Sequence, residues 1–217
     1  MPLPDAGFDR VATFYDPLAR LVFGRALQQA QRAALDGLPP GSPNVLIIGG
    51  GSGWVLTEVL RRRPTARVVY LEAAPAMLAK SRRLMQQTLP GLLGQVEFRL
   101  GTENALLPTE QFDALITFFL LDLFEPIRTR SLVHRLYEAR NPSAPWLLAD
   151  FYPPRWWWQR LLLSTMYQFF RLTTGISGRQ LPPFREEMAR LGLHIQKQQF
   201  FYGGLVEAAV LNEGPAT

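Results

Sequence analysis

Residues 45–60, VLIIGGGSGWVLTEVL, constrain the fold of this chain more than any other stretch. A short run of apolar and β-branched residues, typical of a buried strand, is followed by four glycines within five positions. A helical pattern then begins at Trp54. Glycines in such a turn permit left-handed backbone and let a ligand approach the main chain and the helix N-terminus. The stretch therefore predicts a strand, a tight turn and a helix, with a ligand site between them.

Short apolar segments and helical patterns continue to alternate along the chain, which predicts a parallel sheet with helices on both faces. The last two apolar segments, joined around YGG, are too close in sequence for a parallel crossover and predict an antiparallel hairpin. The expected fold is α/β: a doubly wound, Rossmann-like sheet of seven strands, mostly parallel, with a C-terminal antiparallel hairpin. Strands are expected at 45–48, 67–71, 96–100, within 112–121, at 146–151 and twice within 193–212, and helices at 8–35, 54–62, 75–87, 128–139, 155–175 and 184–191.

The 217 residues suit a single large domain, 1–217, because no stretch reads as a long linker. Its parts are expected to be an N-terminal helical cap at 1–40, a cofactor-binding core at 44–152, lid or acceptor helices at 153–192, and the hairpin at 193–212.

Composition excludes several kinds of chemistry. The chain has no cysteine and only two histidines, so thiolate nucleophiles and His/Cys zinc clusters are excluded and no metal site is predicted. Asp5 and Asp9 precede any apolar run, which argues against a secretory signal. We therefore expect a cytoplasmic protein. The net charge of +5 is best explained by arginines on solvated helix faces, and nucleic acid is not an expected partner because no RNA-binding module is appended.

The glycine turn fits a nucleoside better than a dinucleotide. Gly49, Gly51 and Gly53 are its spaced glycines, but Trp54 occupies the sixth position, where the dinucleotide fingerprint requires glycine or alanine. No lysine follows, so a phosphate-binding P-loop is excluded as well. Glu72 lies 19 residues after Gly53, at the end of the second strand, where an acid can accept hydrogen bonds from both hydroxyls of a ribose. The alternative is a tight turn beside a glutamate with no ligand.

Six segments resemble the class I S-adenosylmethionine-dependent methyltransferases and follow one another along the chain in the order typical of that family. Together they cover almost the whole chain. VLIIGGGSG resembles the first motif of that family, and VVYLEAAPAMLAKSRR its second strand with the ribose-binding acid. VEFRLGTENALLPTEQFDALIT is similar to the following strand, adenine loop and fourth strand. WLLADF and the closing hairpin resemble the last three strands. FDRVATFYDPLARL, near the start, resembles the N-terminal helix of the quinone-ring C-methyltransferases.

The resemblance implies S-adenosyl-L-methionine as the cofactor and methyl transfer as the activity. Two departures stand out: Ile47 replaces the acid common before the first glycine, and Thr102 replaces an acid of the adenine loop. Tyr15 corresponds to the tyrosine that lies over the cofactor. The cofactor-binding residues that the resemblance implies are Gly49, Gly51, Gly53, Glu72, Ala73, Met77, Thr102, Glu103 and Asn104.

Methyl transfer from a sulfonium requires alignment and exclusion of water rather than a protein nucleophile. A base can still help to remove a proton from the acceptor. Asp122 and Asp150 follow or end the fourth and fifth strands, and ligands bind at the carboxyl ends of strands in such sheets. Asp122, Asp150 and Tyr15 are therefore the candidate catalytic residues, although either acid can instead serve as a cap or turn residue. Tyr152 and Tyr202 are candidates for lining the acceptor pocket.

Residues 156–172 form an aromatic-rich helical segment that begins with three tryptophans. Helical spacing puts Gln159, Arg160, Ser164, Gln168 and Arg171 near one face and leaves a wide apolar face. Such a lid favours a small hydrophobic or amphipathic acceptor, such as a quinone precursor or a lipid, and also suits peripheral association with a membrane. The alternative is a helix packed on the sheet.

The sequence therefore predicts S-adenosylmethionine-dependent methyl transfer to a small-molecule acceptor. A non-catalytic nucleoside-binding or interaction protein with the same fold is the alternative, motivated by Ile47 and Thr102. An NAD(P)-dependent oxidoreductase is disfavoured by Trp54 and the terminal hairpin.

Overall fold

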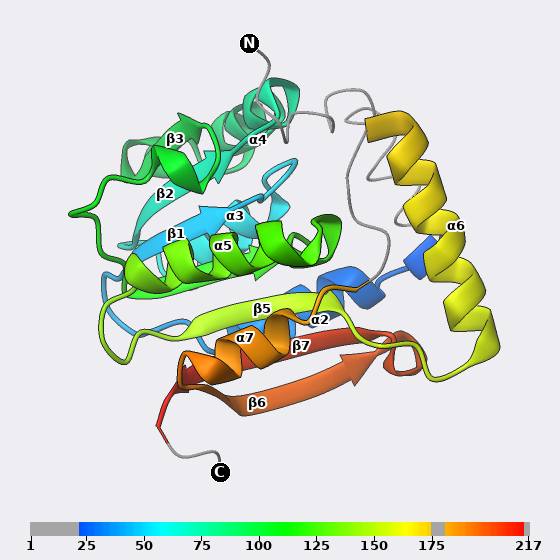
Figure 1. Cartoon of the computed structure of the whole chain (residues 1–217). Helices are drawn as coiled ribbons and strands as arrows, with labels where there is room; N and C mark the ends of the chain where they lie inside the picture. Colours follow the sequence, from blue (N-terminus) through cyan, green and yellow to red (C-terminus); the bar gives the residue numbers. More distant parts are fainter. Residues whose placement is uncertain (1–21, 175–180, 215–217) are drawn as a thin grey trace.

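The computed structural model describes residues 22–174 and 181–214, with side chains described up to residue 168 and again from residue 181. Its centre is one seven-stranded sheet in the order β3-β2-β1-β4-β5-β7-β6 (Figure 1). The strands are β1 (Asn44–Ile48), β2 (Arg67–Glu72), β3 (Val96–Leu100), β4 (Ala114–Phe118), β5 (Trp146–Phe151), β6 (Leu193–Phe201) and β7 (Val206–Glu213).

The helices alternate with these strands as the sequence predicts. Short 3-10 helices fill several of the turns. The α-helices are α2 (Ala26–Leu35), α3 (Trp54–Arg62), α4 (Pro75–Thr88), α5 (Pro126–Glu138), α6 (Trp157–Thr174) and α7 (Phe184–Arg190), and the 3-10 helices are η2 (Pro90–Gln95), η3 (Glu103–Ala105), η4 (Leu121–Leu123) and η5 (Tyr202–Gly204).

Five parallel strands form the larger part of the sheet. β1 pairs with β2 on one side and with β4 on the other, so the chain order reverses between β1 and β4. In open α/β sheets a ligand binds outside the carboxyl ends of the strands at such a reversal. The glycine turn follows β1, so the sequence places it at this position.

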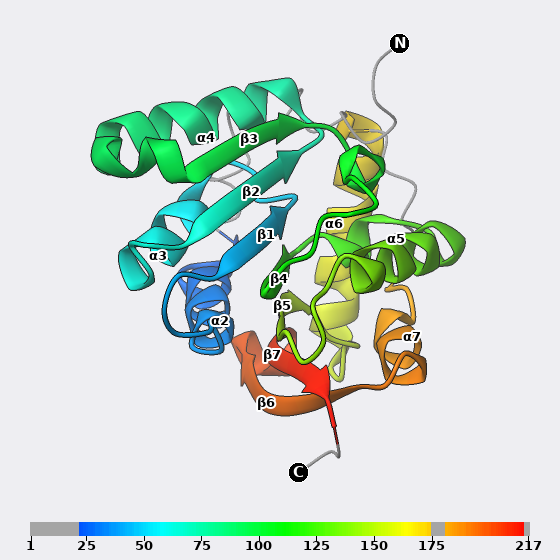
Figure 2. The ribbon, with the colours of Figure 1, turned by 90° about the vertical axis from the view of Figure 1, so that its left-hand side faces the viewer.

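Helices cover both faces of the sheet, in two separate apolar layers (Figure 2). One layer joins α2, α3, α4 and α6 to the sheet, and the other joins α5 and α7. β4 and β5 are buried along their whole length and β1 at all but its first residue, because neither face meets water. This explains why these strands read as continuous apolar runs rather than alternating patterns.

The predicted antiparallel hairpin is confirmed. β7 lies between β5 and β6 and runs antiparallel to both, with Asp150 of β5 opposite Glu207 of β7. Residues directly opposite one another on neighbouring strands point to the same face. Two acidic side chains therefore share one buried face, and this placement becomes important at the site.

The N-terminal helix differs from its prediction. A continuous helix over 8–35 was expected, but the helical turn at 22–23 ends at Gly24, and α2 begins only at Ala26. Gly24 adopts a φ of +57°, in the left-handed region that a right-handed helix does not contain. Residues 1–21 lie outside the described part of the chain.

The polar face predicted for α6 is wrong at Gln159, whose side chain is fully buried. Its Oε1 accepts hydrogen bonds from the backbone N–H groups of Arg155 and Trp156 at 2.8 and 3.1 Å. Its Nε2 donates to the carbonyl of Gly203 at 3.0 Å. One side chain thus caps the start of α6 and ties it to the turn between β6 and β7. Arg160, Ser164 and Gln168 are exposed, as predicted.

We expect Gln159→Ala to lower the free energy of unfolding by roughly 1–3 kcal/mol, because two N–H groups and one carbonyl lose their partner. Urea denaturation measures this loss. Gln168→Ala, at an exposed position of the same helix, is the matched control and should change stability by less than about 0.5 kcal/mol. Equal effects of the two substitutions would contradict a capping role for Gln159.

Candidate cofactor and acceptor site

The glycine turn after β1 takes the left-handed conformation that its composition predicts. Gly49, Gly51 and Gly53 have φ values of +66°, +60° and +93°. These values are accessible to glycine at little cost and are unfavourable for residues with a Cβ atom. The turn then leads directly into α3, which starts at Trp54.

The space around each glycine shows whether it is needed for close packing or lies open to a ligand. A Cβ atom on Gly49 would lie 2.6 Å from the Leu120 side chain, and one on Gly53 would lie 2.7 Å from the Cα of Ser81. These two glycines let the turn approach β4 and α4 closely. A Cβ atom on Gly51 would meet nothing among the described residues within 4 Å. Among the three spaced glycines, Gly51 is therefore the one that faces space a ligand can occupy.

Glu72 connects the end of β2 to this turn. Its Oε2 accepts a hydrogen bond from the backbone N–H of Gly51 at 2.9 Å, and its Oε1 accepts one from Ala74 at 3.0 Å. The hydroxyl of Tyr70 donates to the carbonyl of Gly51 at 2.9 Å, so Gly51 is held on both sides. Parallel neighbouring strands bring the predicted ribose-binding acid and the predicted cofactor turn into direct contact. Two further predicted cofactor residues follow Glu72 in the sequence. Ala73 is half-buried, and Met77, in the first turn of α4, is buried.

The predicted adenine loop is held by an ion pair that the sequence did not indicate. Both carboxylate oxygens of Glu103 accept hydrogen bonds from the Arg128 guanidinium, at 2.6 and 2.7 Å. Glu103 is buried, whereas Asn104 is exposed and Thr102 is half-buried. The bidentate pair makes Glu103 a residue that positions the loop. A role for Thr102, Glu103 and Asn104 in binding adenine stays a prediction.

A strained turn ends β4. Phe119 adopts a φ of +52°, which is uncommon for a bulky residue. Its N–H donates to the carbonyl of Ala149 at 2.7 Å, which holds the strained residue against β5. The turn sends Leu120 over Gly49 and leads into η4, where Asp122 is buried. Strain of this kind gathers at functional sites.

Asp122 and Asp150, the two predicted catalytic acids, form one buried pair. Asp150 is completely buried at the end of β5, and its carboxylate accepts hydrogen bonds from the N–H groups of Leu121 and Phe151, at 3.2 and 2.8 Å. Burial raises the pKa of the Asp150 carboxyl to about 6, against the opposing effect of the nearby Arg185 charge. Burial also raises the pKa of Asp122 well above its ordinary value, and the negative charge of Asp150 raises it further.

Hydrogen bonding also favours the protonated form of Asp122. Within the part of the chain that the structure describes, no N–H or O–H group of another residue donates to either of its carboxyl oxygens. A buried carboxylate without donors is costly, whereas a protonated Asp122 can donate to the neighbouring Asp150. Burial and the charge of Asp150 therefore favour a protonated Asp122 beside Asp150.

An arginine from α7 balances the remaining charge. The Arg185 guanidinium pairs with Glu207, which is completely buried, and also donates to the carbonyl of Phe151 at 2.9 Å. Glu207 lies directly opposite Asp150 in the sheet. Glu207 and Arg185 thus lie beside Asp150 at the end of β5, and the negative charge of Asp150 favours the protonated form of Asp122. Arg185 and Glu207 were not identified from sequence.

Tyr167 of α6 is a further residue that the sequence did not single out. It is buried, and its hydroxyl finds no partner within the described residues. Burial, followed by the charges of Asp122 and Asp150, raises the pKa of its phenol, so the hydroxyl stays protonated near the acid pair. Spacing could have placed Tyr167 on the inward face of α6, because it lies four and eight residues after the buried Leu163 and Gln159.

The outcome differs among the other aromatic residues that the sequence singled out. Tyr15 lies outside the described residues. The Tyr202 hydroxyl donates to the carbonyl of Val22 at 2.9 Å, which makes it a packing contact between the hairpin turn and the N-terminal region. The Tyr152 ring packs edge-on against Phe200, with ring centroids 4.9 Å apart. Among the residues described, no three histidines, aspartates or glutamates lie together in a way that could hold a metal ion.

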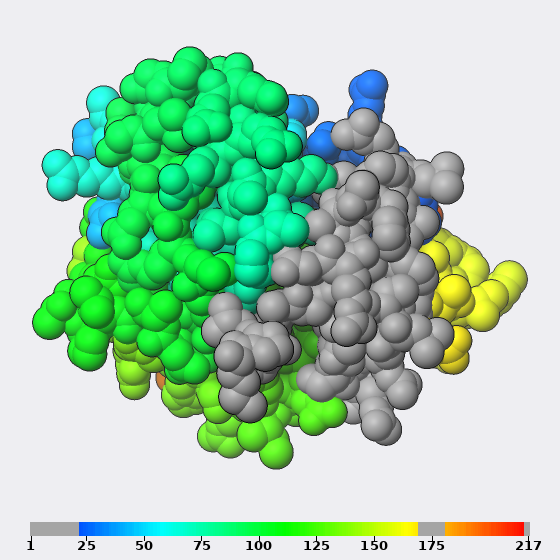
Figure 3. Space-filling view, turned by 90° about the horizontal axis from the view of Figure 1, so that it is seen from above, coloured from blue at the N-terminus to red at the C-terminus, as the bar shows by residue number. Residues whose placement is uncertain are grey.

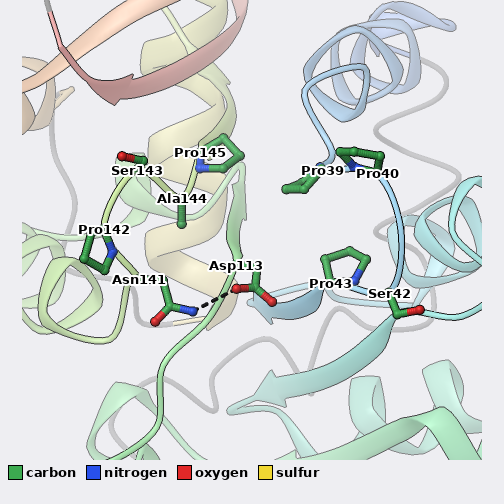
Figure 4. Close-up of a pocket in the computed structure, with 10 residues that line it drawn as sticks. All are labelled: Pro39, Pro40, Ser42, Pro43, Asp113, Asn141, Pro142, Ser143, Ala144 and Pro145. Carbon is green, nitrogen blue, oxygen red and sulfur yellow. Dashed lines mark hydrogen bonds between the residues drawn. The ribbon is translucent and has the colours of Figure 1, made fainter.

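A proline-rich depression lies at the opposite end of the strands from the glycine turn (Figure 4). It is lined by residues that precede β1, β4 and β5, at the amino ends of these strands. Asp113 accepts hydrogen bonds there from the N–H of Asn44 and the amide of Asn141, both at 2.8 Å. Asp113 thus has its partners within or beside the depression, and ligands of this fold bind at the other end of the strands.

The glycine geometry predicts different effects for two matched substitutions. Gly53→Ala should lower the free energy of unfolding by roughly 2–5 kcal/mol, because its Cβ atom would overlap the α4 backbone and its φ is unfavourable. Gly51→Ala should cost only about 1–2 kcal/mol, the strain of its φ alone. Urea denaturation of both variants measures the difference. Equal losses would contradict the assignment of Gly53 to packing and Gly51 to the open side.

The acid pair predicts an unusual dependence of stability on pH. Folding raises both pKa values, so stability from this pair is fully present below about pH 4 and is lost as pH rises through about 6. Asp122→Asn keeps a donor to Asp150 and removes one titrating group. We expect the variant to gain about 1 kcal/mol or more relative to the parent between pH 5 and pH 8, the value of a pKa shift of one unit.

Urea denaturation at several pH values measures this gain. Asp36→Asn, at an exposed position, is the control and should run parallel to the parent. If the Asp122→Asn curve also runs parallel to the parent, the two acids do not share a proton.

Comparison with known proteins agrees with this geometry. A family model described as "Methyltransferase domain" matches residues 45–143, which include the glycine turn, Glu72 and the loop that holds Asp122. The demethylmenaquinone methyltransferase of Thermus thermophilus is 31% identical over 149 residues, which cover 68% of this chain and 65% of that relative. The chain thus matches slightly less than two thirds of the curated relative's length.

Solved structures share the fold. The mitomycin 7-O-methyltransferase MmcR superposes with a TM-score of 0.68 and 22% identity, covering 95% of this chain and 60% of that one. An O-methyltransferase family 2 protein from Planctomyces limnophilus, solved with apigenin, has a TM-score of 0.68 and 19% identity, covering 90% of this chain and 62% of that one. The chain thus resembles methyltransferases in sequence over residues 45–143, and it has the fold of the class I S-adenosylmethionine-dependent methyltransferases.

Proposed function

We propose that this protein transfers a methyl group from S-adenosylmethionine to a small hydrophobic or amphipathic acceptor. The observation that carries the proposal is the contact between Glu72 and Gly51, which joins the ribose-binding acid to the open side of the glycine turn. This contact lies at the reversal of strand order, where ligands of such sheets bind.

The residues present fit the cofactor. A nucleoside needs an acceptor for its ribose hydroxyls and a turn that its chain can approach, and Glu72 and Gly51 supply these two features. The remaining binding groups we propose are Gly49, Gly53, Ala73, Met77, Thr102, Glu103 and Asn104. When bound, the cofactor supplies an activated methyl group on a sulfonium, so the protein itself needs no nucleophile.

The acid pair receives a proton in this proposal. A phenol, or a carbon acidified by neighbouring carbonyl groups, loses a proton as its new bond to the methyl carbon forms. With its pKa raised to about 6, Asp150 is ionised yet basic enough near neutral pH to take up that proton. Asp122 holds the shared proton that keeps Asp150 oriented, and Tyr15 is a further candidate on the cofactor side.

The acceptor class follows from the apolar environment of the site. Phe118, Phe119 and Phe151 gather at the carboxyl ends of β4 and β5, and the Phe119 and Phe151 rings lie 5.5 Å apart. The sequence relative from Thermus thermophilus acts, by its name, on demethylmenaquinone. A quinone precursor or another lipid-like acceptor is therefore the substrate class we propose.

A non-catalytic protein that retains the fold is the second candidate. Ile47 is fully buried in the sheet, at the position where related enzymes commonly carry an acid. Glu103 is engaged by Arg128 rather than held ready for adenine. In this alternative the chain binds a nucleoside weakly or not at all, and it acts through another partner.

Isothermal titration with S-adenosylmethionine, S-adenosylhomocysteine and NADH distinguishes these functions. We expect micromolar binding of both adenosyl ligands and none of NADH. Glu72→Ala should weaken binding of the adenosyl ligands by roughly 1–3 kcal/mol, because a ribose hydroxyl loses its acceptor. Glu97→Ala, on the neighbouring strand, is the matched control and should bind as the parent does.

Loss of folding must be separated from loss of binding, because Glu72 also holds Gly51. The melting temperature of each variant provides this check. Unchanged affinity in a folded Glu72→Ala variant would remove Glu72 from the site. Absence of adenosyl binding in the parent would favour the non-catalytic alternative.

A further inference from the structure

The start of α6 carries large apolar side chains that contact mainly solvent. Trp157 is 75% exposed, Leu161 61% and Trp156 59%. Trp157 and Leu161 are four residues apart and therefore share one face of the helix. An exposed group of this size is unusual on a soluble surface and marks a contact with a partner or a membrane.

The tip of the β6–β7 hairpin extends this surface. The Trp158 ring packs against the Tyr202 ring, with centroids 5.9 Å apart, and Gln159 holds Gly203 by a hydrogen bond. Phe200, near the end of β6, is 47% exposed. We call Trp156, Trp157, Trp158 and Leu161 the tryptophan surface.

The segment that carries the tryptophan surface and the neighbouring β6 segment contain basic residues but no acidic ones over long stretches. Residues 152–184 contain no aspartate or glutamate, and neither do residues 188–206. Arg155 and Arg160 are exposed beside the tryptophans, and Lys197 is exposed on β6. Tryptophans flanked by basic residues suit the interface of a bilayer that contains anionic lipids, where indole rings settle at the level of the headgroups.

The tryptophan surface covers only the first turns of α6, which favours shallow insertion into a bilayer. Along the outward side of α6, Trp157 and Leu161 are followed by Ser164, Thr165 and Gln168, all exposed and polar. A helix that packs along its length against another protein would keep an apolar stripe beyond the second turn. In addition, none of the described helices is long and apolar enough to cross a membrane.

The position of the surface relates it to the site. α6 stands at the side of the sheet toward which β1 points, and this is the side of the glycine turn (Figure 1). Its side chains project at the rim of the molecule in the space-filling view (Figure 3). The inward side of the same helix carries Tyr167 to the buried acids.

We propose that the tryptophan surface docks this protein on bilayers containing anionic lipids, with the acceptor side of the sheet turned toward the membrane. The inference rests on the proposed function in one respect, because a lipophilic acceptor would then reach the site from the bilayer. The aromatic and leucine side chains insert at the headgroup level, and Arg155, Arg160 and Lys197 contact the anionic headgroups.

Flotation with phosphatidylcholine vesicles, with and without 25 mol% phosphatidylglycerol (about a quarter of the lipid), tests the proposal. We expect the parent to float with the anionic vesicles, less in high salt, and only weakly with pure phosphatidylcholine. The double variant Trp157→Ser and Leu161→Ser should lower the partition coefficient by about tenfold or more. Leu107→Ser is the matched control, since Leu107 is 58% exposed in the loop between η3 and β4, and it should bind as the parent does.

Three results would overturn the docking surface: no flotation of the parent at low salt, unchanged flotation of the double variant, or an equal loss in Leu107→Ser. Light scattering decides the remaining alternative. A parent dimer that becomes monomeric in the double variant, without vesicle binding, would assign the surface to a contact between copies of the chain.

Titration of the same preparations with S-adenosylmethionine separates the two proposals. Cofactor binding without flotation overturns the docking surface alone. Flotation without cofactor binding overturns the proposed function alone. The double variant should bind the cofactor as the parent does, because neither substituted residue contacts the glycine turn or Glu72.

Discussion

The hydrogen bond from the Gly51 N–H to the Glu72 carboxylate is the contact on which the cofactor half of the structure depends. It joins the end of one strand to the turn after its neighbour, at the point where the order of strands reverses. A carboxylate that accepts backbone N–H groups is fixed in direction before any ligand arrives. Preorganisation of this kind reduces the entropy lost on binding, which is the main contribution a protein can make when the cofactor carries the reactive group.

The acceptor half depends on a different principle, the cost of burying charge. Asp122, Asp150 and Glu207 are all buried, and the Arg185 guanidinium pairs with Glu207. The remaining charge is reduced by keeping a proton, which is why the two aspartates behave as a pair rather than as independent acids. A core that needed only stability would contain apolar residues here, so the retained acids favour a role in proton transfer.

The sequence predicted the parallel strands and the position of Glu72 at the end of β2 well, because both depend on local order. Apolar runs that end in polar or glycine turns determine where strands stop, and parallel neighbours bring those ends together. Arg185 and Glu207 could not be found this way. A hairpin sequence does not reveal which of its two strands lies beside β5, and this choice alone brings Glu207 opposite Asp150. Gln159 was misplaced because periodicity averages over polar residues and does not identify one that bonds to a distant turn.

The two sides of α6 differ in their surroundings. Its inward face carries Tyr167 toward the buried acids, while its outward start carries Trp157 and Leu161 into solvent. Gln159 joins the start of this helix to the hairpin turn, so the two cannot shift independently without breaking buried hydrogen bonds. A contact that holds the outer side of α6 therefore also fixes the position of Tyr167. In the arrangement we propose, a lipid surface and a lipophilic acceptor would contact opposite sides of α6.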